Sequence, residues 1–123
     1  MSRVSTSEIA TVLAWHDALA AGDADTLLSL SSDDVELAGP QGASQGVAAL
    51  REWLEKFNST LVPGRMFVHH GVVVVEQQFG GDTVATAFRV VHDQVASVFR
   101  HSDLDEALRA TGLGVDDEVS DRP

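Results

Sequence analysis

The pattern of apolar and polar positions between Met66 and Asp103 predicts three antiparallel strands in a meander. Gly80-Gly81 predicts the first turn, because a two-residue hairpin turn requires positive φ at its centre. This turn pairs Phe79 with Asp82. Since side chains alternate between the two faces of a strand, the pairing also decides which residues of the first two strands share a face.

The second turn decides which residues of the last strand face inward. A three-residue loop at His92-Asp93-Gln94 would pair Val91 with Val95 and place Arg100 on the inner face. A two-residue turn at His92-Asp93 is the alternative, and it would slip the register by one residue and turn Arg100 outward. We adopt the three-residue loop.

With this loop the meander has one apolar face that contains a single cation, which we take as the inside, and one more mixed face. The inner face carries the cross-strand rows Val73/Phe88/Val98, Val75/Thr86/Arg100 and Gln77/Val84/Ser102. The outer face carries Val72/Arg89/Ser97, Val74/Ala87/Phe99 and Glu76/Ala85/His101. In the alternative register, Phe99 and His101 would replace Arg100 on the inside.

Helical periodicity and capping residues predict the remaining elements. Helices are expected at Ser7–Ala21, Asp23–Leu30, Val47–Ser59 and Leu104–Ala110. The expected capping residues are Ser7 and Asp103 at N-termini, Glu106 in a capping box, and Gly22 and Gly112 at C-termini. A short strand, Asp33–Ala38, should stop at Gly39-Pro40-Gln41-Gly42, and Thr60–Arg65 should form a loop.

Helices that precede a curved antiparallel sheet indicate an α+β fold. The apolar stripes around Trp15 and Phe57 can cover the inner face of the sheet, which gives a cone-shaped α+β barrel with an incompletely filled interior. We expect a single domain over residues 1–115 and a frayed acidic tail over residues 116–123.

Composition limits the partners of this chain. Nineteen acidic and eight basic residues give a formal charge of -11, which argues against nucleic acid or an anionic membrane as partner. No apolar run approaches the roughly 18 residues of a membrane span, and the N-terminus lacks the apolar core of a secretory signal, so a cytoplasmic location is expected. The absence of cysteine removes thiolate metal sites and thiol nucleophiles.

Two stretches carry a family resemblance. WHDALAAGDADTLLSLSSDDVELAGPQGASQGVAALREWL and the closing DLDEALRATGL, with three long strands between them, resemble the nuclear-transport-factor-2-like superfamily, and within it the SnoaL-like domains. The resemblance covers roughly residues 5 to 115. It implies a cone-shaped α+β barrel that is often dimeric, in a group that includes ketosteroid isomerases, limonene-epoxide-hydrolase-like enzymes, polyketide cyclases and non-catalytic members.

The catalytic residues of two of these groups have no counterpart here. The isomerase tyrosine, general-base aspartate and protonated aspartic acid fall on Trp15, Gly39 and Thr86. The water-activating aspartate of the epoxide hydrolases falls on Arg100, which has the opposite charge. For the cyclases, Asp103 lies near the strand end but is turned away from the pocket. These family chemistries are therefore not expected in their standard form.

Arg100 is the most informative candidate. Burying an unpaired cation is costly, so an inward Arg100 needs either Glu36 as an internal partner or an anionic or carbonyl ligand. The residues expected to line the pocket are Trp15, Leu19, Trp53, Phe57, Val73, Val75, Gln77, Val84, Thr86, Phe88, Val98 and Ser102. Simple core packing is the alternative for the aromatic residues among them.

We therefore expect a largely apolar pocket for a small hydrophobic molecule with a carbonyl or carboxylate group, oriented by Arg100, Thr86 and Gln77. In a catalytic version Arg100 polarises the oxygen and Glu36 is the base, for an isomerisation, cyclisation or hydration. The orientation of Glu36 is left open. The alternative is a non-catalytic ligand-binding module or a dimeric interaction module.

The sequence indicates neither a metal site nor a cofactor. His69 and His70 are adjacent in a predicted strand and would point to opposite faces, and the other histidines are scattered. The outer face is expected to form a homodimer, because an apolar surface of this length is rarely left in water. Its expected contact residues are Val74, Ala85, Ala87, Phe99 and His101.

Overall fold

The computed structural model describes residues 3–39, 42–56 and 61–119. The helices are α1 (Arg3–Ala21), α2 (Ala24–Ser29), α3 (Val47–Lys56), α4 (Leu104–Thr111) and a short 3-10 helix, η1 (Val115–Asp117). The strands are β1 (Ser31–Gly39), β2 (Gly42–Gln45), β3 (Leu61–His69), β4 (Val72–Phe79), β5 (Asp82–Val91) and β6 (Gln94–His101). The expected α+β class is confirmed.

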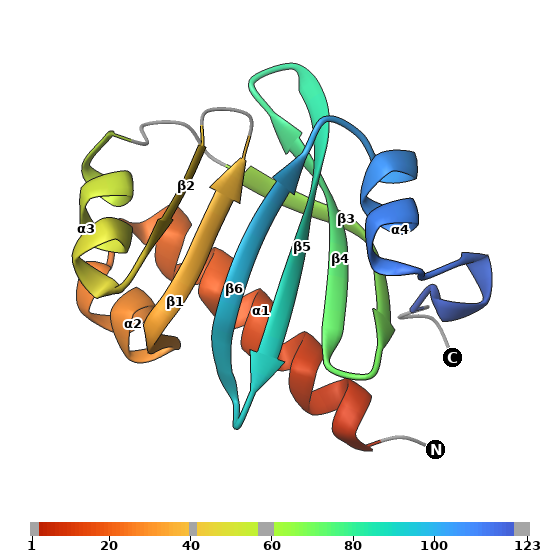
Figure 1. Cartoon of the computed structure of the whole chain (residues 1–123), viewed down its shortest axis with the longest axis horizontal. Helices are drawn as coiled ribbons and strands as arrows, with labels where there is room; N and C mark the ends of the chain where they lie inside the picture. Colours follow the sequence, from red (N-terminus) through yellow and green to blue (C-terminus); the bar gives the residue numbers. More distant parts are fainter. Residues whose placement is uncertain (1–2, 40–41, 57–60, 120–123) are drawn as a thin grey trace.

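The six strands form one curved sheet in the order β2-β1-β6-β5-β4-β3. The β1–β6 pair is parallel and the other neighbours are antiparallel. Figure 1 shows α1 running across one face of the sheet, with α2 and α3 at the β1–β2 end and α4 at the β3–β4 end. The sheet does not close on itself, so the molecule is an open cone rather than a complete barrel.

The predicted register of β4, β5 and β6 is confirmed, although the second turn was predicted wrongly. His92 and Asp93 adopt positive φ of 53° and 62°, and the turn has two residues, since Val91 pairs with Gln94. Val90 then pairs with Val95 but Arg89 pairs with Ser97, so Ala96 is an extra residue in β6. This β-bulge cancels the slip of the shorter turn and keeps Arg100 on the inner face, opposite Thr86.

The predicted loop Thr60–Arg65 is wrong over its described part, because β3 begins at Leu61. A register irregularity between Pro63 and Met66 accommodates the proline and Gly64 within the strand. The meander consequently has four strands rather than three. His70 lies in the β3–β4 turn at a φ of 50° and not in a strand, contrary to the sequence prediction.

Strand β2 was missed because its four residues are all exposed and carry no apolar alternation. It pairs with β1, which extends the predicted Asp33–Ala38 strand at both ends. Over the described residues the helices agree with the prediction to within a residue or two, except that α1 begins at Arg3; the predicted end of the third helix, residues 57–59, lies outside the described residues. Ser7 is therefore not an N-cap, and its Oγ donates to Asp93 Oδ1 at 2.8 Å.

Helix α4 follows its predicted caps closely. Asp103 Oδ1 accepts from the Glu106 backbone N–H at 2.8 Å, and Gly112 ends the helix in the left-handed conformation at a φ of 78°. The Glu106 carboxylate, however, accepts from the Ser102 backbone N–H at 2.9 Å. The predicted capping box is thus displaced by one residue.

Two apolar clusters lie on the two faces of the sheet. The main one joins α1, α2 and α3 to the inner face and includes Trp15, Leu50 and Phe88. The second lies on the outer face, where Ala107 of α4 and Leu113 pack with Phe67 and the outer row residues. Val74, Ala85 and Ala87 are buried there within a single chain. The expectation that these three residues are open to a partner subunit is therefore wrong, because α4 covers them.

The described part of the acidic tail is docked rather than frayed. Phe67 of β3 forms a bridge with Glu118, and the Val119 backbone N–H donates to Met66 O at 2.8 Å. Arg65 binds the Glu118 carboxylate with two hydrogen bonds of 2.9 and 3.0 Å. The tail thus covers the free edge of β3, which limits unwanted pairing of that edge with another chain.

Candidate ligand-binding cleft

An open cleft of about 570 Å³ lies between α3 and the inner face of the sheet at its β1–β6 end. This volume falls within the range of small-molecule sites, roughly 300 to 1,000 Å³. The lining residues come from β1, β2, α3, β4 and β6, and most are small or apolar. They are Leu37, Ala38, Gly39, Gly42, Ala43, Ser44, Ala49, Glu52, Trp53, Phe79, Val98 and Arg100.

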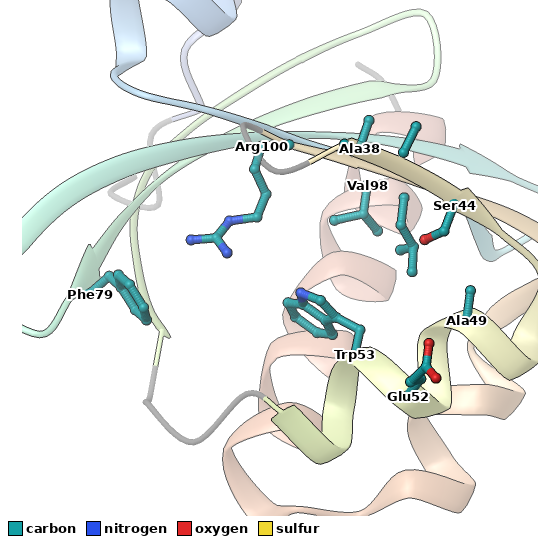
Figure 2. A pocket seen from close by; sticks show the side chains of 12 residues that line it. Ala38, Ser44, Ala49, Glu52, Trp53, Phe79, Val98 and Arg100 are labelled. Atoms are coloured by element: carbon teal, nitrogen blue, oxygen red, sulfur yellow. The ribbon is translucent and has the colours of Figure 1, made fainter.

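Arg100 reaches into the cleft from β6, and Figure 2 shows its guanidinium pointing toward the space between Phe79 and Trp53. Gly39 of β1 lies beside its stem, where a Cβ would be at ordinary contact distance, 3.5 Å, from Arg100 Cβ. The guanidinium carbon lies 5.3 Å from the centre of the Phe79 ring, within cation–π range.

The charge of Arg100 has no protein counter-ion in the described part of the chain. The ion pairs found there join Arg65 to Glu118, His69 to Asp117 and His101 to Glu106. Burial lowers the pKa of Arg100. The guanidinium is thus partly desolvated and has unused hydrogen-bond donors that face the cleft.

The sequence between residues 12 and 114 matches the model of the SnoaL-like domain family. This match spans most of the chain. The chain belongs to the SnoaL-like domain family. The family resemblance drawn from the sequence is therefore confirmed, together with its cone-shaped α+β fold.

Several solved structures have a similar fold. A putative polyketide cyclase from Sinorhizobium meliloti has 19% identity and a TM-score of 0.69, and the match covers 74% of this chain and 93% of that one. TerC co-crystallised with polyporic acid has 17% identity and a TM-score of 0.71, and the match covers 85% of this chain and 96% of TerC. A putative ketosteroid isomerase from Kribbella flavida has 18% identity and a TM-score of 0.66, and the match covers 78% of this chain and 77% of the isomerase. Among curated proteins, no significant match to the sequence is found.

In this SnoaL-like domain the cleft brings together only some of the residues predicted to line it. Arg100, Trp53 and Val98 do line it. The others that the structure describes lie elsewhere: Trp15, Leu19, Val73, Val75 and Phe88 in the packed core, Val84 against that core, and Ser102 on the surface. Phe57 lies outside the described residues. Beneath α1 the inner face is packed, and the cleft lies toward α3.

Glu36 does not reach the cleft. Val35 and Leu37 are buried on the inner side of β1, and Glu36 between them is exposed on the opposite side. Neither an ion pair with Arg100 nor a role as base in the cleft fits this placement. The alternation of side chains along a strand excludes both readings at once.

The structure adds lining residues that sequence reasoning missed. Phe79 lies at the end of β4, and Ala49 and Glu52 lie on α3 beside Trp53. Positions 49, 52 and 53 are spaced by three and four residues, so they share a helix face that could have been read from the sequence once Trp53 was chosen. The β2 residues carried no such signal.

Gln77 and Thr86 were expected to orient the ligand, but they belong to a buried hydrogen-bond chain. Thr86 Oγ1 donates to Gln77 Oε1 at 2.7 Å, and the Gln77 amide nitrogen lies 2.8 Å from His16 Nε2. His16 Nδ1 lies 2.8 Å from Val12 O, and because a carbonyl only accepts, Nδ1 carries the proton. Nε2 is then the acceptor for Gln77, and His16 is neutral.

The buried hydrogen bonds of His16 predict that the free energy of unfolding depends on pH. Burial lowers the pKa of His16, against opposing contributions from its hydrogen bond to Val12 and the charge of Asp17. A histidine whose folded pKa lies below its unfolded value, about 6.5, contributes stability that is complete above pH 6.5 and declines as pH falls through the folded pKa. We expect the free energy of unfolding, measured by urea denaturation, to fall between pH 7.5 and 5.5 by up to about 1.4 kcal/mol per pH unit.

The matched variants are His16→Gln, which can still accept from Gln77 but does not titrate, and His92→Asn in the exposed β5–β6 turn. His16→Gln should flatten the pH dependence over this interval, whereas His92→Asn should retain it. Equal slopes for the wild type and His16→Gln would show that His16 is not responsible.

Among the residues that the structure describes, no three or more His, Asp or Glu side chains gather in a way that could hold a metal ion. None of the described helices combines the length and the apolar character that a membrane crossing requires.

Proposed function

We propose that this protein binds a small, largely apolar molecule that carries a carboxylate or carbonyl oxygen, and that Arg100 is its anchor. The observation that carries the proposal is the partly buried Arg100 guanidinium, which has no counter-ion among the described residues and faces a cleft lined mostly by small and apolar residues. An anionic ligand would supply the missing counter-charge and accept two parallel N–H···O bonds, the arrangement that guanidinium groups favour.

The walls favour a ligand with a flat ring. Trp53 and Phe79 line the cleft on either side of the guanidinium, and aromatic faces stack well on planar molecules. The structural neighbour TerC, which was crystallised with polyporic acid, supports a small organic acid as the class of ligand for this fold. A volume of about 570 Å³ accommodates two fused rings with substituents.

For a ligand with a carbonyl group, Arg100 is placed to polarise the oxygen, as an isomerisation, cyclisation or hydration would require. The base suggested by the sequence, Glu36, lies on the other face of the sheet. Binding is therefore the function that we propose. Of the two alternatives drawn from the sequence, the non-catalytic ligand-binding module describes the cleft better than the enzyme.

The test is a matched pair of probes, 2-naphthoate and 2-naphthamide, which share a ring system and differ in charge. Isothermal titration calorimetry should give clearly tighter binding of the carboxylate, because only it offers a charge to the guanidinium. Equal affinities, or no binding of either probe up to millimolar concentration, would count against the proposal.

We also propose a homodimer through the part of the outer face that α4 leaves open. Phe99 of β6 pairs in register with Ala38 of β1 and is 39% exposed, with Glu36 and Arg89 exposed on neighbouring strands. His101 is half-buried, and its Nδ1 lies 3.5 Å from Glu106 Oε1 of α4. It therefore lies at the edge of the proposed dimer surface. Small Ala38 beside Phe99 would allow two sheets to approach closely.

Phe99→Asp should dissociate this dimer, because a carboxylate in an apolar contact is costly to desolvate. Sedimentation velocity at micromolar concentration is expected to show a dimer for the wild type and a folded monomer for the variant. Val91→Asp is the control, since Val91 is also exposed but lies at the β5–β6 turn. A monomeric wild type would contradict the proposal.

A further inference from the structure

The two charged side chains that line the cleft lie at different places along it. Arg100 enters from β6 and Glu52 from α3. In Figure 2 the Glu52 carboxylate lies on the far side of Trp53 from the guanidinium. No ion pair joins the two in the described structure, where such pairs involve other residues. The cleft therefore has one charged group of each sign, at two separated points.

We propose that the ligand is ditopic, with an anionic or carbonyl oxygen at Arg100 and a hydroxyl group that donates to Glu52, joined by an apolar ring body. This inference rests on the proposed function and deepens it. A carboxylate only accepts hydrogen bonds, and among the described side chains none donates to Glu52, so a donor from the ligand is its natural complement.

The mainly apolar lining of the cleft sets the form of the molecule between these points. Trp53, Ala49, Leu37 and Val98 line the cleft and offer mainly apolar surface, and the Trp53 indole N–H is the one hydrogen-bonding group among these four side chains. A ring between the two groups would bury apolar area against the indole. A hydroxyaryl carboxylic acid has the required order of groups.

The opposite charges also fix the direction in which such a ligand binds. Its carboxylate is attracted by Arg100 and repelled by Glu52, because the lining has one charge of each sign and they are spatially separated. The reversed pose would place two carboxylates together and leave the guanidinium facing a neutral hydroxyl. Glu52 is thus a specificity-determining residue, because it selects the group at the end of the ligand remote from Arg100.

The test uses three probes that share one ring system: 2-naphthoate, 6-hydroxy-2-naphthoate and 6-methoxy-2-naphthoate. The methoxy compound has similar bulk at position 6 but cannot donate a hydrogen bond. For the wild type, calorimetry should give about five- to tenfold tighter binding of the hydroxy probe than of the methoxy probe, a value reduced by the exposure of Glu52.

Glu52→Met keeps the length of the side chain and removes the acceptor, so the ratio between the two probes should fall to about one. Glu55→Met is the matched control on the same helix, because Glu55 is exposed and is not among the cleft residues. It should leave both the ratio and the affinity for unsubstituted 2-naphthoate unchanged.

The failure of this inference is distinguishable from the failure of the proposed function. If 2-naphthoate binds through Arg100 but the hydroxy and methoxy probes bind equally, or if their ratio survives Glu52→Met, the ditopic ligand is excluded and the anion site remains. If 2-naphthoate does not bind, or binds equally well after Arg100→Met, the proposed function itself fails and this inference fails with it.

Discussion

Arg100→Met is expected to weaken the binding of 2-naphthoate by about 10- to 150-fold, the loss of a charge-assisted hydrogen-bond pair worth roughly 1.5 to 3 kcal/mol. Methionine is of similar length and can occupy the space beside Gly39 and Phe79 that the arginine stem fills now. Binding of the neutral 2-naphthamide should change much less, since it never used the charge. Calorimetry of both probes with both proteins gives the comparison directly.

The same substitution should leave the free energy of unfolding within about 1 kcal/mol of the wild-type value, because two small contributions oppose each other. Loss of the cation–π contact with Phe79 destabilises the fold, and removal of a partly desolvated charge stabilises it. Arg89→Met is the control, since Arg89 is exposed on the outer face. A loss of several kcal/mol in ligand-free Arg100→Met would instead assign Arg100 a structural role.

Trp15→Ala should lower the free energy of unfolding by about 3 to 5 kcal/mol, the usual cost of emptying a large aromatic site in a core. Trp15 is 1% exposed, and its ring centre lies 5.3 Å from that of Phe88 and 6.1 Å from that of Trp53. Its Nε1–H also donates to Ser31 Oγ at 3.2 Å, which leaves a buried hydroxyl with one partner fewer in the variant.

Leu13→Ala on the same helix is the control for Trp15→Ala, because Leu13 is 39% exposed and should cost under about 1 kcal/mol. Urea unfolding of the two variants at pH 7.5 provides the measurement. Similar losses for both would mean that α1 packs on the sheet less specifically than the structure indicates. Since Trp15 supports Trp53, Trp15→Ala should also weaken 2-naphthoate binding, whereas Leu13→Ala should not.

The register of the meander was predicted correctly, although only the first of its two turns was. Gly80-Gly81 demanded the first turn, and the pairing of Phe79 with Asp82 followed. The second turn was misread, because His92 and Asp93 both adopt the left-handed conformation without glycine. Ala96, whose bulge restores the predicted rows, has no sequence signal that separates it from a regular strand residue.

The cleft was harder to predict than the fold. Alternation assigns residues to a face of the sheet, but it cannot say which part of that face helices will fill. Val73, Val75 and Phe88 share their face with Arg100, yet α1 packs on them and leaves them no open space. The cleft depends on where α3 and the exposed β2 lie, and neither position is encoded in a local pattern.

The dimer surface predicted from the sequence was also covered in part by a helix. Val74, Ala85 and Ala87 were correctly placed on the outer face, and the prediction failed because α4 returns to cover them. The capping residues Asp103, Glu106 and Gly112 predicted a helix at Leu104–Ala110, but not the sheet face on which α4 packs. Long-range packing of this kind follows from the whole fold.

The most direct measurement of the central claim is a titration of 15N-labelled protein with 2-naphthoate, followed by NMR at the arginine Nε–H signals and assigned with Arg100→Met. We predict that the Arg100 signal alone shifts and saturates with the carboxylate, and that 2-naphthamide leaves it nearly unchanged. An Arg100 signal that does not respond while 2-naphthoate binds elsewhere would contradict the assignment of Arg100 as the anchor of the cleft.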